Sequence, residues 1–232
     1  MVTKLLVCLA NSYKEGGRCV AGKDSDGTWF RPVGRGGGGA VSKYERQYIL
    51  NREPRMLDRI SIVLSRRCGE EFQRENWLVD SDACWLYMGQ AGWNEAFSLT
   101  ERPESLWLNG YRTERGVNNC VPVARKSEVR DSLKFIHVDE VGVTVSPRLG
   151  GKRRVRVSFY YNGVEYMLPV TDPEFLKKWQ VSNERINRER EYRLGESLLT
   201  VSLARESAKD KENLHKLIAG IIERGDPKLA VI

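Results

Sequence analysis

Residues 9 to 34, LANSYKEGGRCVAGKDSDGTWFRPVG, gather polar, basic and thiol side chains around two glycine turns. Asn11, Lys14 and Arg18 are of the types that hold a phosphate, and the Gly-Gly pair between them supplies free backbone N–H groups. The spacing GxxxxGK[ST] of a P-loop is absent. An ordinary hairpin, in which Asn11 caps its own turn and the cations face water, explains the same residues. Both interpretations stay open at this point.

Further groups could complete a reactive or binding centre. A thiol close to two cations can be nucleophilic, but the strand pattern around Cys19 predicts a buried, inert thiol. Glu75 and Asn76 supply a carboxylate and an amide, and convergence with Arg31 would form a nucleotide pocket. Glu75 can equally serve only to neutralise an arginine. We assign no catalytic residue.

The five cysteines are scattered, and none forms a CxxC pair. Because the chain has only two histidines, a metal site would need a long-range assembly, and we predict no metal and no cofactor. We expect no membrane association and a cytoplasmic location, since no apolar run approaches the roughly 20 residues of a membrane span and the N-terminus is too short for a signal peptide.

The net charge of +7 favours a polyanionic partner. A protein binds single-stranded nucleic acid through two main contributions, stacking of bases on aromatic rings and ion pairing of arginines with phosphates. The first half supplies both types, although each cation alone is also explained as part of a solvated strand face. The cations are Lys14, Arg18, Lys23, Arg31, Arg35 and Arg46, and the rings are Tyr13, Trp29, Phe30, Tyr44 and Tyr48.

The second half carries a basic strip of its own in the segment RRVRVSFYY (153–161). Side chains alternate between the two faces of a strand, so Arg154 and Arg156 share one face and Arg153 takes the other. Together with the aromatic residues that follow, this pattern predicts a second nucleic-acid-binding strip.

Most of the elements that must position these residues are short strands. Strand-like segments bounded by turn residues cover 4–10, 17–33, 57–66, 133–147, 153–170, 197–206 and 215–222. The Asn-Gly pair at 162–163 is the strongest hairpin signal. Helix is limited, and the best candidate spans 172–191, with Asp172 as N-cap and Pro173 at the first helical position. We expect the aromatic-rich segment 72–111 to form loops and helical turns, and the GRGGGGA segment (34–40) to form a flexible loop.

A weak internal repeat suggests duplication. Each half opens with an apolar strand, KLLVCL or KFIHV, and a later hairpin ends in WFRPV or YMLPV. An apolar strand then follows around Ile60 and around Val201. The sequence therefore predicts a mainly β fold of two small barrels with short helices and long loops. We place the first domain at 1–125, including a Trp-rich insertion, and the second at 126–232.

The order of several motifs resembles the bacterial dual OB domain-containing proteins. These motifs are LANSYKEGGRCVAG, WFRPV, LD before a strand, EN at 75–76, SLW at 105–107, VTDP at 170–173 and the closing KLIAGII. One departure is WFRPVG in place of the more usual WIRPVS. The resemblance implies two OB-like barrels in tandem and a nucleic-acid-related role, with a place in phage-conflict systems.

We therefore predict a non-enzymatic nucleic-acid-binding accessory protein of a phage-defence or DNA/RNA repair system, with single-stranded DNA or RNA favoured as partner. Two alternatives stay open: a nucleotide-recognising enzyme or sensor with a pocket in the N-terminal half, and an antitoxin-like scaffold that binds a protein through its Trp-rich region. The predicted phosphate or nucleic-acid contacts are Asn11, Lys14, Arg18, Trp29, Arg31, Arg35, Glu75, Asn76, Arg154 and Arg156.

Overall fold

The protein consists of two compact units. Its computed structural model describes residues 1–14, 17–36, 39–46, 52–114, 116–147, 153–180 and 188–225. Unit 1 comprises Met1–Thr100 and Arg130–Ser132, and unit 2 comprises Glu101–Val129 and Leu133–Ile232. The packing thus divides the chain earlier than the predicted boundary at residue 125. Residues 101–125, which the sequence placed with the first domain, pack in unit 2.

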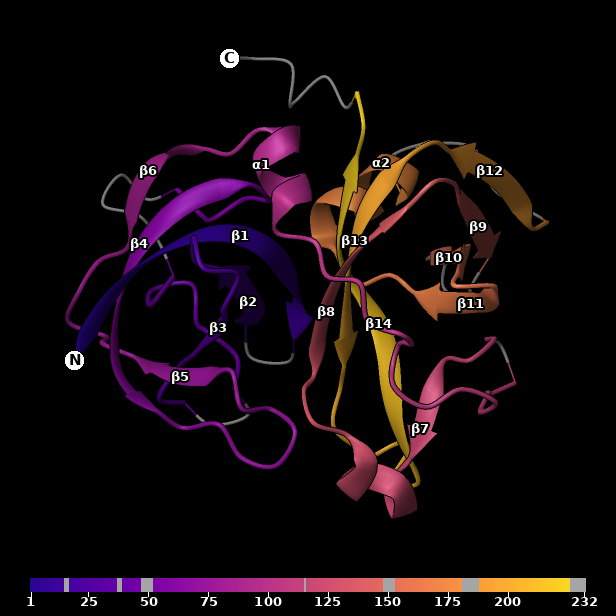
Figure 1. Cartoon of the computed structure of the whole chain (residues 1–232), viewed down its shortest axis with the longest axis horizontal. Coiled ribbons are helices and arrows are strands. Elements are labelled where there is room, and N and C mark those ends of the chain that lie inside the picture. Colours follow the sequence, from indigo (N-terminus) through magenta and orange to yellow (C-terminus); the bar gives the residue numbers. More distant parts are fainter. Residues whose placement is uncertain are drawn as a thin grey trace. The chain divides into compact units, whose positions relative to one another are not determined.

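Unit 1 is built on a closed five-stranded barrel (Figure 1). The strands follow the order β1-β2-β3-β5-β4, and β4 pairs back onto β1 to close the ring. All neighbours are antiparallel except β3 and β5, which are parallel. This is the Greek-key arrangement of an OB-fold. The five strands are β1 (Val2–Lys14), β2 (Gly17–Lys23), β3 (Trp29–Val33), β4 (Asp58–Arg67) and β5 (Asn76–Val79).

Strand β1 is long enough to pair with two neighbouring strands, β2 and β4, and this allows the barrel to close. Its residues Val2–Val7 pair with β4, and the stretch from Val7 to Lys14 pairs with β2. The register shifts between Cys8 and Ala10, and such a bulge bends a strand and increases its twist. Two elements flank the barrel: β6 (Leu86–Gln90), which pairs with β4, and α1 (Trp93–Ser98).

Unit 2 contains two four-stranded sheets, with the orders β11-β10-β9-β12 and β7-β14-β13-β8. Two further elements complete it, a 3₁₀ helix (Val123–Glu128) and α2 (Pro173–Gln180). The strands are β7 (Cys120–Pro122), β8 (Leu133–Val138), β9 (Val141–Pro147), β10 (Arg153–Tyr161), β11 (Val164–Pro169), β12 (Arg190–Leu194), β13 (Ser197–Leu203) and β14 (Asn213–Glu223).

The strand order of unit 2 repeats that of unit 1, with two strands broken into pieces. β8 and β9 together correspond to β1, and β12 and β13 together correspond to β4. β13 pairs with β8 and β12 pairs with β9, as β4 pairs with β1. β10 and β11 correspond to β2 and β3, and β14 corresponds to β5. A parallel bridge between Val170 and Ile218 links the end of β11 to β14, as β3 is linked to β5. The predicted tandem of OB-like barrels is therefore confirmed, and WFRPV and YMLPV lie at equivalent third strands.

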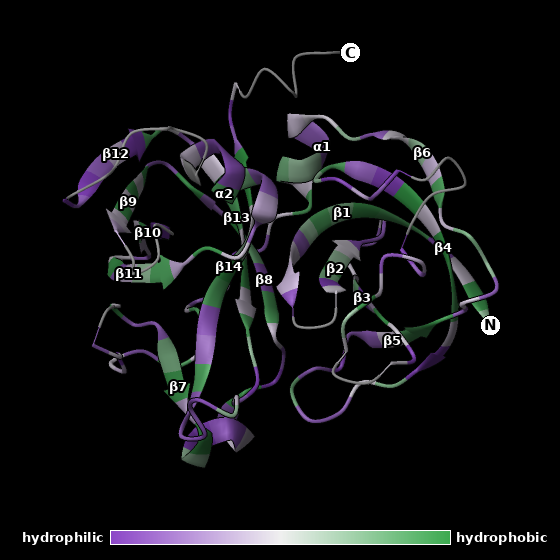
Figure 2. Cartoon of the chain, turned by 180° about the vertical axis from the view of Figure 1, so that it is seen from behind, coloured by the Kyte–Doolittle hydropathy of each residue, from purple (hydrophilic) through white to green (hydrophobic). Residues whose placement is uncertain are grey.

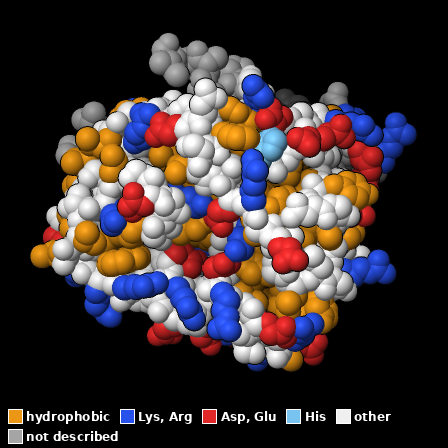
Figure 3. Space-filling view, in the orientation of Figure 1, with side chains coloured by type: hydrophobic (Ala, Val, Ile, Leu, Met, Phe, Trp, Pro, Cys, Tyr) orange, Lys and Arg blue, Asp and Glu red, His pale blue; other side chains and the backbone are white. Residues whose placement is uncertain are grey.

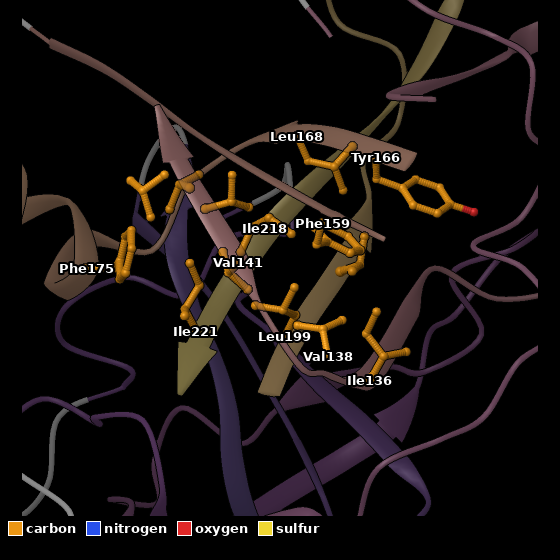
Figure 4. Close-up of a cluster of buried hydrophobic side chains, with 14 of the residues drawn as sticks. Ile136, Val138, Val141, Phe159, Tyr166, Leu168, Phe175, Leu199, Ile218 and Ile221 are labelled. Carbon is orange, nitrogen blue, oxygen red and sulfur yellow. The ribbon is translucent and has the colours of Figure 1, made fainter. Parts of the chain in front are cut away.

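Alternation along the strands separates each core from its surface, as the hydropathy of successive residues shows (Figure 2). In unit 1 most core residues come from β1 to β5, and Val41 and the fully buried Trp85 come from the connections between strands. In unit 2, Phe159 of β10 stacks on Tyr166 of β11 with ring centroids 5.4 Å apart. Ile218 of β14 and Phe175 of α2 belong to the same cluster (Figure 4).

Two local predictions for unit 2 are confirmed. Asn162 and Gly163 both have positive φ angles, 48° and 74°, as a tight hairpin turn between β10 and β11 requires. Asp172 caps α2, since its Oδ1 accepts hydrogen bonds from the backbone N–H groups of Glu174 and Phe175. Burial raises the pKa of Asp172, and these N–H donors oppose that shift.

Other local predictions were incomplete or wrong. The predicted helix 172–191 is described as a helix only to Gln180, and its last two residues belong to strand β12. Residues 181–187, and Gly37 and Gly38 of the glycine tract, lie outside the described residues. The aromatic-rich segment contains two strands, β5 and β6, which the sequence did not indicate. No helix in the described ranges is long and apolar enough to cross a membrane.

Candidate functional site

In unit 1, Asn11 and Arg18 face the inner side of the barrel. Asn11 pairs with Val20, a core residue, and Arg18 lies two residues before Val20 on the same strand. The Asn11 amide donates to the carbonyl of Pro54 at 2.6 Å. The Arg18 guanidinium lies 4.3 Å from the centroid of the exposed Tyr13 ring. The buried Nη1 atom of Arg18 has no hydrogen-bond partner among the described residues.

Lys14 and Arg35 lie at the same end of the barrel, beside the glycine tract. Glu45 organises this connection, because its carboxylate accepts hydrogen bonds from the backbone N–H groups of Ser42 (2.9 Å) and Arg35 (3.1 Å). The Ser42 hydroxyl in turn accepts from the Glu45 N–H, which completes a capping box. Partial burial would raise the pKa of Glu45, but these hydrogen bonds outweigh it and lower the pKa.

Arg31 and Glu75 form a buried ion pair, with side chains 2% and 7% exposed. The hydroxyl of Ser132 contacts both partners. Arg31 follows the core residue Phe30 on β3, so it points to the outer side of the barrel. Lys23 of the neighbouring β2 is also buried and donates to the carbonyl of Leu99 at 2.9 Å. The two cations on the outer face of β2 and β3 are therefore both buried.

The structure does not bring the predicted N-terminal residues into one pocket. Asn11 and Arg18 lie on the inner side of the barrel, and Arg31 and Glu75 lie on the outer side. Trp29 and Asn76 are half-buried on β3 and β5. The Asn76 side-chain oxygen is buried and has no hydrogen-bond partner among the described residues.

Unit 2 leaves the equivalent face open. Strand β10 lies between β9 and β11, and its residues Val155, Val157 and Phe159 point into the core. Arg154 and Arg156 therefore point outward from the middle of the sheet, as the sequence predicted. Opposite them on β9 stand Ser146 and Thr144. Arg153 takes the other face, and its guanidinium bonds to the carbonyl of Trp179 in α2.

A groove with a volume of about 990 Å³ lies on this face. The two arginines of β10 form its floor with side chains of β9 and β11. Residues 112, 114, 116 and 117 line one wall, and Glu189, directly before β12, lies at the other. The lining comprises Arg112, Glu114, Gly116, Val117, Ser146, Pro147, Arg154, Arg156, Met167 and Glu189.

The wall formed by residues 112–114 and 116–117, which we call the wall loop, makes backbone and asparagine contacts at Thr113 and Val117. Val117 and Met167 exchange backbone hydrogen bonds of 3.3 and 3.0 Å, so the loop adds to the edge of β11. The Asn119 side chain accepts from the Thr113 N–H at 2.8 Å and donates to its hydroxyl at 2.7 Å. A Cβ at Gly116 would lie 2.3 Å from Asn119 Nδ2, so this contact requires glycine.

The segment that precedes the wall loop is anchored by Lys216 of β14, which is fully buried. Its ammonium donates to the carbonyl of Leu108 at 2.8 Å, lies 3.4 Å from Asn109 Oδ1 and lies 5.2 Å from the Tyr166 ring centroid. The Tyr166 hydroxyl donates to the same Asn109 oxygen at 2.8 Å. Burial lowers the pKa of Lys216 to about 7.

An exposed aromatic ring stands on the same face as the groove arginines. Tyr160 is 70% exposed and lies four residues after Arg156 on β10, so both side chains point outward. On the face drawn in Figure 3, by contrast, Lys and Arg side chains are interspersed with Asp and Glu rather than gathered into one patch. The face drawn in Figure 3 is therefore not uniformly basic.

A comparison with protein families supports this architecture. The model of the dual OB-containing domain matches residues 4–221. The chain belongs to this family. No curated protein and no solved structure matched the chain in the corresponding comparisons. Family membership and the strand order agree on two OB-folds, a fold that uses its second and third strands and the adjoining loops to bind oligonucleotides and oligosaccharides.

Several groove residues escaped sequence reasoning. Arg112, Glu114 and Glu189 lie outside the strands and had no alternation pattern to mark them. The available signal was the pair Asn118-Asn119 close to Gly116, residue types that favour an ordered turn. Among the described residues, no group of three or more His, Cys, Asp and Glu side chains could hold a metal ion.

Proposed function

We propose that this dual OB protein binds single-stranded nucleic acid in the groove of unit 2. The observation that carries the proposal is the contrast between the two barrels. On the outer face of the second and third strands of unit 1, the two cations Lys23 and Arg31 are buried. The equivalent strands of unit 2 line an open groove with Arg154 and Arg156.

The arginine spacing suits an extended phosphate backbone. Residues two apart on one strand face lie about 6.6 Å apart, which resembles the separation of neighbouring phosphates in a stretched single strand. Arginine binds phosphate bidentately, so each guanidinium can engage one phosphate. Ser146 and the wall-loop Arg112 add further polar contacts along the groove.

Tyr160 favours a single strand over a duplex. A base stacks on an exposed ring only when it is not already stacked in a duplex, and such stacking contributes about 1 to 3 kcal/mol per base. Tyr160 lies on the same strand face as Arg154 and Arg156, and this supports a proposed path of the backbone beside the ring. Phosphate pairing and base stacking are thereby available along one strand.

The test is a filter-binding salt series with labelled single- and double-stranded DNA and RNA, starting near 50 mM salt. We expect R154Q/R156Q to weaken single-strand binding at least tenfold. The slope of log K against log salt should fall by about 1.4, since each lost phosphate contact removes about 0.7. The matched control is R205Q/K211Q, which removes two charges on the exposed connection between β13 and β14. Wild-type binding without salt dependence, or equal binding by both variants, would refute the proposal.

Lys14, Arg18 and Arg35 stay proposed as secondary phosphate contacts of unit 1, because Arg18 stacks on the exposed Tyr13. Arg31 and Glu75 are engaged with each other and are not included. In the Trp-rich region Trp85 is buried, and Trp77, Trp93 and Trp107 are half-buried. The same region exposes the apolar side chains Leu86, Tyr87, Met88 and Phe97. The scaffold hypothesis therefore stays an alternative. A role in phage defence or repair stays a prediction.

A further inference from the structure

A row of paired residues crosses the outward face of unit 2 next to the groove arginines. Gly142 of β9 pairs with Ser158 of β10, and Ser158 pairs with Met167 of β11. Residues directly opposite each other on neighbouring strands share one face of the sheet. Ser158 lies two residues after Arg156, so this row, which we call the cross-strand row, lies on the face of the groove arginines.

The backbone does not require the glycine in the cross-strand row. The pairing of β9 with β10 runs from Gly142 to Pro147 without a register shift, and the φ angle of Gly142 is not positive. A glycine inside a regular strand often marks a place where a ligand approaches closely. A Cβ at this position would lie 2.5 Å from the Ser158 hydroxyl. That hydroxyl therefore lies over Gly142, and the sheet surface is low at this point.

Two larger side chains flank the cross-strand row. Arg156 and Tyr160 lie two residues before and after Ser158 on the same face of β10, and Tyr160 is 70% exposed. Successive residues on one strand face are about 6.6 Å apart, so the two flanking residues are separated by about 13 Å. One flat nucleobase fits in this gap, over Gly142 and Ser158 and with a face against the Tyr160 ring. Met167, which also lines the groove, offers it an apolar contact from β11.

From these observations we infer that Gly142, Ser158 and Met167 form the floor of a slot that takes one unpaired nucleobase. The inference rests on the proposed function, in which the groove arginines bind phosphates and Tyr160 stacks on a base. It adds where that base lies and which residues keep the place open. The Ser158 hydroxyl both donates and accepts hydrogen bonds, so it can bond to the edge of any base. The slot therefore requires an unpaired base and does not select one kind of base.

The experiment measures fluorescence anisotropy with a labelled oligouridine of five nucleotides, in which an abasic nucleotide replaces each position in turn. The strand from Arg154 to Tyr160 spans about 20 Å, the length of about three stretched nucleotides, so a probe of this length has little room to slide. Loss of the base at one position should weaken wild-type binding about tenfold, as expected for one stacked base. Abasic nucleotides at the other positions should have little effect, because every phosphate is kept.

Two pairs of variants assign this effect to the slot. Y160L should bind the intact and abasic probes equally, and its control Y44L, which removes an exposed tyrosine of unit 1, should behave as wild type does. G142V/S158A places a branched side chain in the slot and removes the hydroxyl that a Cβ at Gly142 would meet. It should bind the intact probe as weakly as the abasic one. Its control S158A leaves the slot open and should keep the difference between the probes.

The slot and the proposed function fail in different ways. Salt-dependent binding that is insensitive to the loss of a base at every position overturns the slot and leaves the proposed function intact. An abasic effect that persists in Y160L or in G142V/S158A also overturns the slot, since the sensitive base would then lie elsewhere. Absence of salt-dependent binding to every probe, including the longer strands of the filter-binding series, overturns both proposals.

Discussion

Replacement of Lys216 tests whether this buried amine controls the stability of unit 2. Its pKa falls from 10.5 to about 7 in the folded protein because burial disfavours the ammonium form. Between these two values the unfolded chain binds a proton that the folded protein does not. The free energy of unfolding should therefore rise with pH, by about 1.4 kcal/mol per pH unit for this group. Across the whole window its contribution is on the order of 5 kcal/mol.

The variant K216M keeps the length of the side chain and removes the titrating group. Cys120 and Tyr166, whose pKa values are raised by burial, are the titratable neighbours of Lys216 and are present in both proteins. The difference between wild type and K216M therefore reports the lysine together with its electrostatic effect on Cys120, whose pKa it lowers. At pH 7 the variant also loses the hydrogen bond to the Leu108 carbonyl, at a cost of about 1 kcal/mol.

The assay is urea unfolding followed by tryptophan fluorescence at pH 7, 8 and 9. Wild type should gain stability relative to K216M at each step, and the exposed control K211M should behave as wild type does. Parallel pH profiles for wild type and K216M would show that the amine does not titrate in this window, and the reasoning from burial would fail.

Two further variants probe other contacts. R31M should lower the free energy of unfolding by about 3 to 5 kcal/mol in urea, because it leaves Glu75 buried without its cation; a double variant R31M/E75Q that is as unstable as R31M would argue against this cause. G116A should cost about 1 to 3 kcal/mol by thermal or urea unfolding, because the new Cβ would meet Asn119. Its control is G195A, where a Cβ meets no atom within 4 Å, and equal losses in the two alanine variants would contradict the packing argument.

The features that the sequence predicted correctly depend on neighbouring residues. The Asn162-Gly163 turn, the Asp172 cap and the outward direction of Arg154 and Arg156 each follow from a few consecutive side chains. β5 was missed because it has only four residues and pairs in parallel with β3, a contact between distant parts of the chain. The Arg31–Glu75 pair likewise joins residues 44 positions apart.

Prediction of the candidate site was limited for the same reason. Alternation marks strand residues, so it identified the floor of the groove and said nothing of its walls. Arg112 and Glu114 belong to the wall loop, which reaches the groove through contacts such as the pairing of Val117 with Met167, far along the chain. The notable exception is the internal repeat, where similar motifs in the two halves indicated a long-range feature from local patterns alone.

The placement of Ser132 bears on how the protein can be dissected. Its hydroxyl serves a buried pair of unit 1, although residues 101–129 before it in the chain belong to unit 2. A fragment of residues 1–100 would therefore expose the Arg31–Glu75 pair and lack its third partner. A fragment of residues 1–125 would lack the same serine and carry the wall loop without the strand that supports it. Separate expression of unit 1 therefore calls for a chain in which residues 130–132 are linked to residues 1–100, whereas residues 101–232 contain the whole of unit 2.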